Sequence, residues 1–264
     1  MTTEYKIKEL DLNTIKPVDI NDRDGAKYVF IGKPGMGKSQ ALLQLLYSKK
    51  HIIPVGEVYS GSELYDPFYD KYFPELVIHY DFDFTVANLE RFQQRQLLAK
   101  KNLNRPWAVQ IVDDSTSDKK IFNRPIVQNY YKNGRHWKML HLLATQHVFD
   151  LPTTVRTCID GTFIMKEISE ENRLKIWKNF ASIIPKKDFN DFMDQLTEDY
   201  HCIFVKNNST SKRLDELVFY FKANPLIIPS DWKFGSEAFW DVCNIRYDKD
   251  YKPPSQFLDD KKRK

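Results

Sequence analysis

Gly32-Lys33-Pro34-Gly35-Met36-Gly37-Lys38-Ser39 directly follows the apolar run Tyr28-Val29-Phe30-Ile31. The eight residues fit the pattern G-x-x-x-x-G-K-[ST] of a phosphate-binding loop, and the apolar run predicts the strand that delivers such a loop to the edge of a sheet. The next residues, 40–48, carry leucines on a face suited to a helix docked on a sheet. A glycine turn that merely contains a lysine is the plain alternative, but it would not need this context on both sides. The stretch therefore predicts a binding site for a nucleoside triphosphate.

The loop residues have distinct expected tasks in binding ATP and Mg²⁺. The glycines let consecutive backbone N–H groups point at phosphate oxygens, and the N-terminus of the following helix adds partial positive charge. Lys38 is expected to reach the β- and γ-phosphates, and Ser39 to offer its hydroxyl to Mg²⁺. The complete nucleotide-binding set is Gly32, Lys33, Pro34, Gly35, Met36, Gly37, Lys38, Ser39 and Gln40.

A second buried strand is predicted at Trp107–Val112, and it runs into Asp113 and Asp114. A carboxylate at such a strand end organises Mg²⁺ in phosphate-loop enzymes, and we assign this role to Asp113. Adjacent residues at a strand end point in different directions, so Asp114 is expected to face the γ-phosphate and orient the attacking water. The alternative is that the two aspartates only begin a polar turn.

Three further side chains are candidates for catalysis. Gln146 follows the apolar run Leu142–Thr145, and its amide can both donate and accept while it senses the γ-phosphate or positions water. Arg135, in the turn before that strand, is our first choice for an arginine finger acting on a neighbouring subunit, because we expect it close to the nucleotide edge of the sheet. Arg156 is the alternative finger. For each of the three, an ordinary surface position is the competing interpretation.

Strands and helices alternate along the chain, which predicts an α/β fold with a mostly parallel sheet flanked by helices. Two strand candidates, 55–60 and 76–80, separate the loop strand from the strand ending at Asp113. This spacing is consistent with an extra strand inserted between those two in the sheet, and it favours a RecA-like motor core over small kinases and GTPases. Two helices within 169–196 and a β-hairpin formed by 201–205 and 217–221 are expected to follow.

From the sequence we predict three parts: an N-terminal arm (1–24), a P-loop ATPase domain (25–221, core motifs 27–165) and a C-terminal extension with a charged tail (222–264). The hydrophobic fraction of 42% is sufficient for a sizeable core. The three scattered cysteines predict neither a disulfide framework nor a zinc site, and favour a reducing compartment. The N-terminus lacks an apolar signal region, and no apolar run is long enough for a membrane span.

The motifs together resemble those of the FtsK–HerA superfamily. The phosphate loop, Asp113-Asp114, the Asn133-Gly134-Arg135-His136 turn, Thr145-Gln146 and the segment from Leu151-Pro152 to Arg156 occur in the order seen there. Within the superfamily the chain looks like the poxvirus-type genome-packaging ATPases of large DNA viruses and virophages. The resemblance covers about residues 27–165.

The resemblance implies a homo-oligomeric ring, a pentamer or hexamer, that hydrolyses ATP to move double-stranded DNA into a preformed capsid. It also implies contacts with DNA that are mostly to the backbone and tolerant of sequence, a capsid or portal protein as a partner, and a location in the host cytoplasm (the viral factory) and the virion. Two departures stand out. Asp114 occupies a position where many of these motors have glutamate, and the chain is expected to be a motor core without an appended nuclease or membrane-anchor domain.

The basic residues outside these motifs are ambiguous. The net charge of +4 is compatible with DNA binding but does not require it. Lys206, Lys212 and Arg213 flank a predicted hairpin loop that is either solvated or in contact with DNA phosphates, and Lys261–Lys264 forms a basic tail. The six histidines show no metal-ligand spacing, so nucleotide-bound Mg²⁺ is the metal we expect.

Two other functions remain open from the sequence. One is a nucleotide kinase that uses the same loop, although no acceptor pocket or arginine-bearing lid is evident. The other is an ATP-binding assembly factor without significant turnover, in which Asp114 is too short to support hydrolysis.

Overall fold

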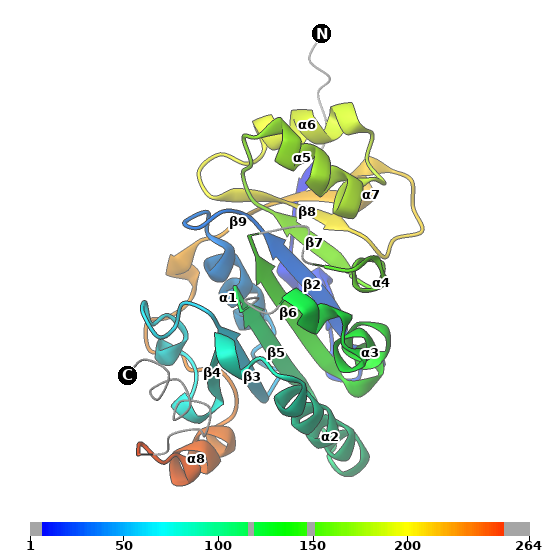
Figure 1. Cartoon of the computed structure of the whole chain (residues 1–264). Helices are drawn as coiled ribbons and strands as arrows, with labels where there is room; N and C mark the ends of the chain where they lie inside the picture. Colours follow the sequence, from blue (N-terminus) through cyan, green and yellow to red (C-terminus); the bar gives the residue numbers. More distant parts are fainter. Residues whose placement is uncertain (1–6, 116–118, 147–150, 251–264) are drawn as a thin grey trace, which may run out of the picture.

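The computed structural model describes residues 7–115, 119–146 and 151–250. Among them, a nine-stranded sheet with the order β1-β9-β8-β7-β2-β6-β5-β3-β4 runs through the molecule, with helices on both of its faces (Figure 1). The strands are β1 (Lys8–Glu9), β2 (Ala26–Ile31), β3 (Val55–Ser60), β4 (Ile78–Tyr80), β5 (Ala108–Asp113), β6 (Met139–Thr145), β7 (Gly161–Ile164), β8 (His201–Lys206) and β9 (Val218–Lys222).

The helices expected at 40–48 and within 169–196 are present, and further helices lie where none was predicted. The α-helices are α1 (Lys38–Ser48), α2 (Val86–Asn102), α3 (Pro125–Asn133), α4 (Thr153–Arg156), α5 (Glu170–Ile176), α6 (Lys186–Gln195), α7 (Leu214–Leu217) and α8 (Glu237–Arg246). Short 3₁₀ helices lie at Leu12–Thr14, Tyr69–Lys71, Glu75–Val77, Asp81–Asp83, Lys119–Asn123, Gly134–Trp137 and Pro225–Ile227. The helix expected from residue 169 to 180 is α5, which continues into a π-helical turn at Trp177–Ala181.

The central strands are parallel, as expected for an α/β fold. β2 pairs in parallel with β6 on one side and with β7 on the other, and β5 pairs in parallel with β3 and β6. β8 pairs antiparallel with both β7 and β9, so the predicted hairpin is confirmed, and its strands extend the main sheet. The mostly parallel sheet flanked by helices is therefore confirmed.

Alternation along β2 explains why both faces of the sheet are covered. Tyr28 and Phe30 pack into an apolar cluster that includes the buried face of α1, whereas Val29 and Ile31 pack into a second cluster with α2, α3 and α6. Strands buried on both faces read as continuous apolar runs, which is the pattern that the sequence shows here. The loop after β2 is thereby delivered to the carboxyl edge of a rigid sheet.

One strand does lie between β2 and β5, as expected for a RecA-like core, but it is β6. The two candidates that precede β5 in the chain, β3 and β4, lie beyond β5 instead. The order of the strands along the chain therefore did not predict which strand is inserted between β2 and β5. The consequence for the site is direct, because the end of β6 lies between the phosphate loop and the end of β5.

Parts of both flanking segments belong to the packed core. β1, from the predicted arm, pairs in parallel with β9, and Leu12 and Ile15 lie in the α1 cluster. Phe234, from the predicted extension, is fully buried in the same cluster. The three-part division of the chain stays a prediction, and its charged tail lies outside the described residues. No helix in the described part of the chain is long and apolar enough to cross a membrane.

Candidate nucleotide-binding site

The predicted phosphate loop joins β2 to α1 at the carboxyl edge of the sheet. Gly35 and Gly37 have φ angles of +76° and +85°, a left-handed conformation that glycine adopts without strain. The N–H of Gly32 donates to the carbonyl oxygen of Thr145 at 3.2 Å, which ties the start of the loop to β6. The Nζ of Lys38 donates to the carbonyl oxygen of Lys33 at 3.3 Å, so this side chain folds back over the loop. The geometry fits the binding of phosphate groups.

Asp113, at the end of β5, lies against the start of α1. Its Oδ2 accepts a hydrogen bond from Ser39 Oγ at 2.7 Å and a second from the Tyr69 hydroxyl at 2.7 Å. Burial raises the pKa of Asp113 above its usual range and the nearby charge of Asp114 adds to this, while the two hydrogen bonds oppose the shift. Mg²⁺ prefers a few carboxylate and hydroxyl oxygens together with substrate phosphates, so Ser39 and Asp113 fit such a site.

Asp114 follows with its backbone in the left-handed region, with φ of +50°, and its carboxylate has partners different from those of Asp113. Its Oδ2 lies 3.7 Å from Lys38 Nζ and accepts a hydrogen bond from Gln146 Nε2 at 3.0 Å. This side chain is partly exposed, unlike that of Asp113, which leaves room for a water molecule beside it. The structure thus brings together Lys38, Asp114 and Gln146, three of the residues that the sequence selected.

Tyr69 is a site residue that sequence reasoning missed. It is fully buried, and it reaches Asp113 from the loop that follows β3. Glu63 shapes this loop, since its Oε1 accepts hydrogen bonds from the N–H groups of Phe68, Tyr69 and Asp70. The aromatic, proline-containing stretch after β3 was a visible signal, but it did not indicate which ring would reach the carboxylate.

A cavity of about 370 Å³ opens beside the loop, large enough for a bound small molecule. Its lining consists of loop and α1 residues together with three residues from distant parts of the chain: Gly35, Gly37, Lys38, Ser39 and Gln40, then Tyr200, Ala223 and Pro225. The last three were not predicted. They arrive at the loop through strand pairing in β8 and β9, which no local motif reveals.

The expectation that Arg135 lies close to the nucleotide edge is wrong. Its carbonyl oxygen accepts a hydrogen bond from the N–H of Gly25, just before β2, and its side chain is exposed there. In parallel strands the residue before a strand and the residue after it lie at opposite edges of the sheet. A strand as long as β6 separates those edges by roughly 20 Å at about 3.3 Å per residue.

Arg156 makes its hydrogen bonds within its own segment of the chain. Its guanidinium donates to the carbonyl oxygen of Leu151 at 3.0 Å and to Thr153 Oγ1 at 2.9 Å, within α4 and the turn before it. Arg135, by contrast, has an exposed guanidinium whose Nε lies 3.4 Å from the Nε2 of His136. Action on a neighbouring subunit stays a prediction for either arginine.

The basic loop between β8 and β9 is partly neutralised. The guanidinium of Arg213 forms ion pairs with Asp215 at 2.7 Å and with Glu216 at 3.3 Å. This pairing favours the solvated-loop interpretation for Arg213. Within the described residues, no group of three or more histidine, cysteine or acidic side chains could hold a metal ion. The basic tail at 261–264 lies outside those residues.

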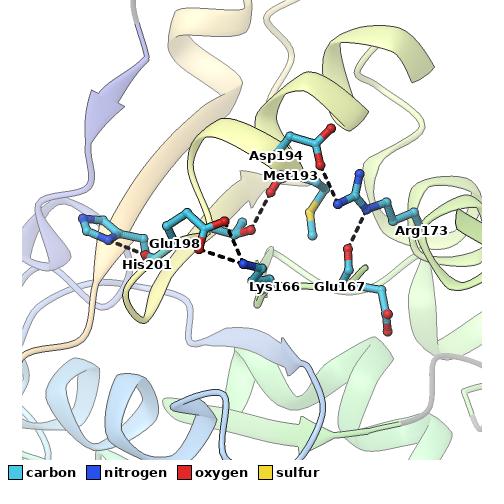
Figure 2. A network of polar contacts seen from close by, with 8 residues as sticks. Lys166, Glu167, Arg173, Met193, Asp194, Glu198 and His201 are labelled. Atoms are coloured by element: carbon cyan, nitrogen blue, oxygen red, sulfur yellow. Dashed lines mark hydrogen bonds and ion pairs between the residues drawn. The ribbon is translucent and has the colours of Figure 1, made fainter. Parts of the chain in front are cut away.

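The segment after β7 contacts the phosphate loop through Glu167. Lys33 Nζ pairs with Glu167 Oε1 at 2.9 Å, and the same oxygen accepts the N–H of Ser169 at 2.9 Å. Although burial acts in the opposite direction, these hydrogen bonds lower the pKa of Glu167. Figure 2 shows Lys166 turned the other way, toward Glu198. The segment after β7 therefore braces the phosphate loop.

Comparison with other proteins identifies close relatives. Protein 075L of Invertebrate iridescent virus 6 is 41% identical over 95% of this chain and 98% of its own length. Protein L437 of Acanthamoeba polyphaga mimivirus is 26% identical over 94% of this chain and 86% of its own. The chain belongs to this family of viral proteins. Both relatives are named as uncharacterized, so membership of this family does not by itself assign an activity to the chain. No model of a known protein family matches the chain.

The fold of this chain matches the folds of solved ATPases of viral DNA packaging and of conjugation. The DNA-packaging ATPase B204 of Sulfolobus turreted icosahedral virus matches with a TM-score of 0.60 at 18% identity, over 77% of this chain and all of B204. The pCW3 conjugation coupling protein TcpA matches with a TM-score of 0.52 at 11% identity, over 84% of this chain and 64% of its own. At such identities the likeness concerns the fold. The expected P-loop ATPase fold is therefore confirmed.

The position of Asp114 leads to a specific prediction. Replacing it by asparagine should slow ATP turnover by about 10²–10⁴-fold, the usual contribution of a general base, because an amide is a poor acceptor for the proton of water. ATP binding should be retained, since the phosphate loop and the Ser39–Asp113 pair are unchanged. Phosphate release and equilibrium ATP binding would be measured on the same protein.

Asp231→Asn, on an exposed carboxylate, provides the matched control and should behave as the wild type. Loss of ATP binding in Asp114→Asn, in proportion to any loss of turnover, would instead make Asp114 a structural residue.

Proposed function

We propose that this protein is an ATP-hydrolysing double-stranded DNA translocase that packages a viral genome into the capsid. One observation carries the proposal: Lys38 and Ser39 of the phosphate loop, Asp113 and Asp114 at the end of β5, and Gln146 at the end of β6 converge at one edge of the sheet. Two carboxylates in different environments, one buried and one open to solvent, suit separate roles in metal binding and water activation.

The residues would divide the work as follows. Lys38 and the loop N–H groups stabilise the negative charge that develops on the transferred phosphoryl group. Ser39 and Asp113 would hold Mg²⁺, which would supply positive charge beside the phosphate groups. Asp114 accepts a proton from the attacking water and orients it, while Gln146 holds the Asp114 carboxylate through its amide N–H. An arginine from a neighbouring subunit supplies further positive charge in the transition state.

The translocation part of the proposal rests on family and fold. The relatives come from iridescent viruses and mimivirus, and B204 is described as a DNA-packaging ATPase. We therefore propose a homo-oligomeric ring, a pentamer or hexamer, that contacts the DNA backbone and docks on a capsid or portal protein. Its place would be the host cytoplasm, in the viral factory, and the virion.

The decisive experiment measures ATP hydrolysis with and without duplex DNA, with the oligomeric mass determined in the same buffer. We expect DNA to stimulate hydrolysis by an oligomeric form. Phosphoryl transfer to nucleosides or nucleotides, without stimulation by DNA, would favour a nucleotide kinase. ATP binding without measurable turnover would favour an assembly factor.

Binding to duplex DNA should be insensitive to sequence and steeply dependent on salt. Each phosphate neutralised by a lysine or arginine releases counterions, so the logarithm of the binding constant should fall linearly with the logarithm of the salt concentration. The slope would be measured by fluorescence anisotropy on several unrelated duplexes of equal length. A strong preference for one short sequence, undiminished by salt, would point to a regulator and contradict the motor.

A further inference from the structure

The cavity beside the phosphate loop extends past the residues that bind phosphate. Its far wall is formed by Tyr200, Ala223 and Pro225. β8 begins and β9 ends at this edge of the sheet, since His201 is paired with Lys222 in the antiparallel ladder. The turn before β8 and the segment after β9 therefore lie together next to the loop, although more than 150 residues separate them from it in the chain.

Tyr200 is held over the loop in an unusual backbone conformation. It has φ of +62°, and the preceding Asp199 has φ of +49°; both are left-handed values that non-glycine residues seldom adopt. The ring lies close to the loop, because a Cβ atom placed on Gly37 would be 3.5 Å from Tyr200 Cδ1. Even so, 64% of Tyr200 is exposed. The residue thus presents an open aromatic face to the cavity instead of packing into the core.

The turn that carries Tyr200 is anchored to the same segment that braces the loop (Figure 2). Both carboxylate oxygens of Glu198 lie 2.7 Å from Lys166 Nζ, and the Nδ1 of His201 lies 2.7 Å from the carbonyl oxygen of Glu198. The adjacent Glu167 holds Lys33 of the phosphate loop. Lys166 and Glu167 consequently fix the turn and the loop relative to each other.

The remaining residues of this far wall are held in place and apolar. The N–H of Asn224 donates to Gln44 Oε1 at 2.9 Å, which ties the segment after β9 to α1. The two lining residues of this segment, Ala223 and Pro225, have no polar side-chain atoms. Among the residues that line the cavity, Gln40 is the one with a side-chain amide.

We propose that this outer part of the cavity is the subsite for the nucleoside half of the triphosphate, and that Tyr200 stacks on the base. The inference rests on the proposed function and adds its base-binding residues. Stacking is tolerant of sequence because every base has a π face. Because Ala223 and Pro225 beside Tyr200 offer no polar side-chain atoms, we further infer that the site accepts GTP almost as well as ATP.

The test is calorimetric titration of ATP, GTP and inorganic tripolyphosphate into wild-type, Tyr200→Ala and Tyr200→Phe protein. Tyr200→Ala should weaken ATP and GTP by about tenfold or more, the scale of losing one stacked base, and leave tripolyphosphate unchanged. Tyr200→Phe should bind as the wild type, because the ring is retained. Leu226→Ala provides the control: its side chain is 90% exposed beside Pro225, outside the cavity lining, and should have no effect.

Three results would overturn the inference. Unchanged ATP affinity in Tyr200→Ala would remove the stacking role, and an equal loss for tripolyphosphate would mean that the ring acts on the loop. A preference of the wild type for ATP over GTP of about 100-fold would contradict the weak discrimination between bases. Failure of the proposed function would appear in a different measurement, as ATP hydrolysis that duplex DNA does not stimulate, while the effect of the Tyr200 variants on nucleotide binding would be unchanged.

Discussion

ATP hydrolysis is expected to fall by at least about 10²–10³-fold when Lys38 is replaced by alanine, the scale of losing one preorganised group that stabilises transition-state charge. Lys38 is buried against the loop, where its ammonium lies 3.7 Å from Asp114 Oδ2. Without the Lys38 ammonium, no positive charge would separate the negative Asp114 carboxylate from the negative γ-phosphate of bound ATP. Both the transferred phosphoryl group and the ground-state complex would therefore be destabilised.

Steady-state phosphate release, measured at saturating ATP and Mg²⁺, checks this prediction. Lys50→Ala is the matched control, because it removes a lysine just beyond the C-terminal end of the same helix and should leave turnover intact. Near-normal turnover in Lys38→Ala, with the fold preserved by circular dichroism, would remove the phosphate-loop interpretation altogether.

The second large effect concerns the arginine finger. An arginine supplied by a neighbouring subunit contributes about 10³–10⁵ in turnover in known phosphate-loop systems, because it meets charge that develops only in the transition state. Arg135→Ala protein should therefore be inactive and still bind ATP. Mixing it with Lys38→Ala protein should restore some activity, since an intact Arg135 from one subunit can serve the intact loop of its neighbour.

The position of Arg135 at the amino edge of the sheet makes a parallel experiment with Arg156 necessary. Arg156→Ala should be tested in the same mixtures, and recovery with that variant, but not with Arg135→Ala, would assign the finger to α4. Arg105→Ala provides the control, because Arg105 is exposed and lies just before β5 at the same amino edge. Confirmed mixed rings without recovery for either arginine would exclude both as fingers acting between subunits.

The sequence by itself determined the local parts of the site. The glycine spacing around Lys38 requires left-handed backbone at Gly35 and Gly37, and the structure has it. The apolar runs before the loop and before Asp113 are β2 and β5, whose parallel carboxyl ends bring Ser39 and Asp113 into hydrogen-bond contact. The backbone conformation of the loop and the two buried strands follow from short-range rules of backbone conformation and burial, whereas the contact of Ser39 with Asp113 also needs the two strands to lie parallel in one sheet.

Only the tertiary structure decided which other side chains contact the phosphate loop and the two aspartates. The insertion of β6 between β2 and β5 places Gln146 against Asp114, and the same strand carries Arg135 to the far edge. Tyr69 and Tyr200 reach the site from loops whose sequences contain no motif. The physical reason is that strand order and loop packing depend on which distant apolar surfaces bury one another, and this information is shared among segments instead of residing in any one of them.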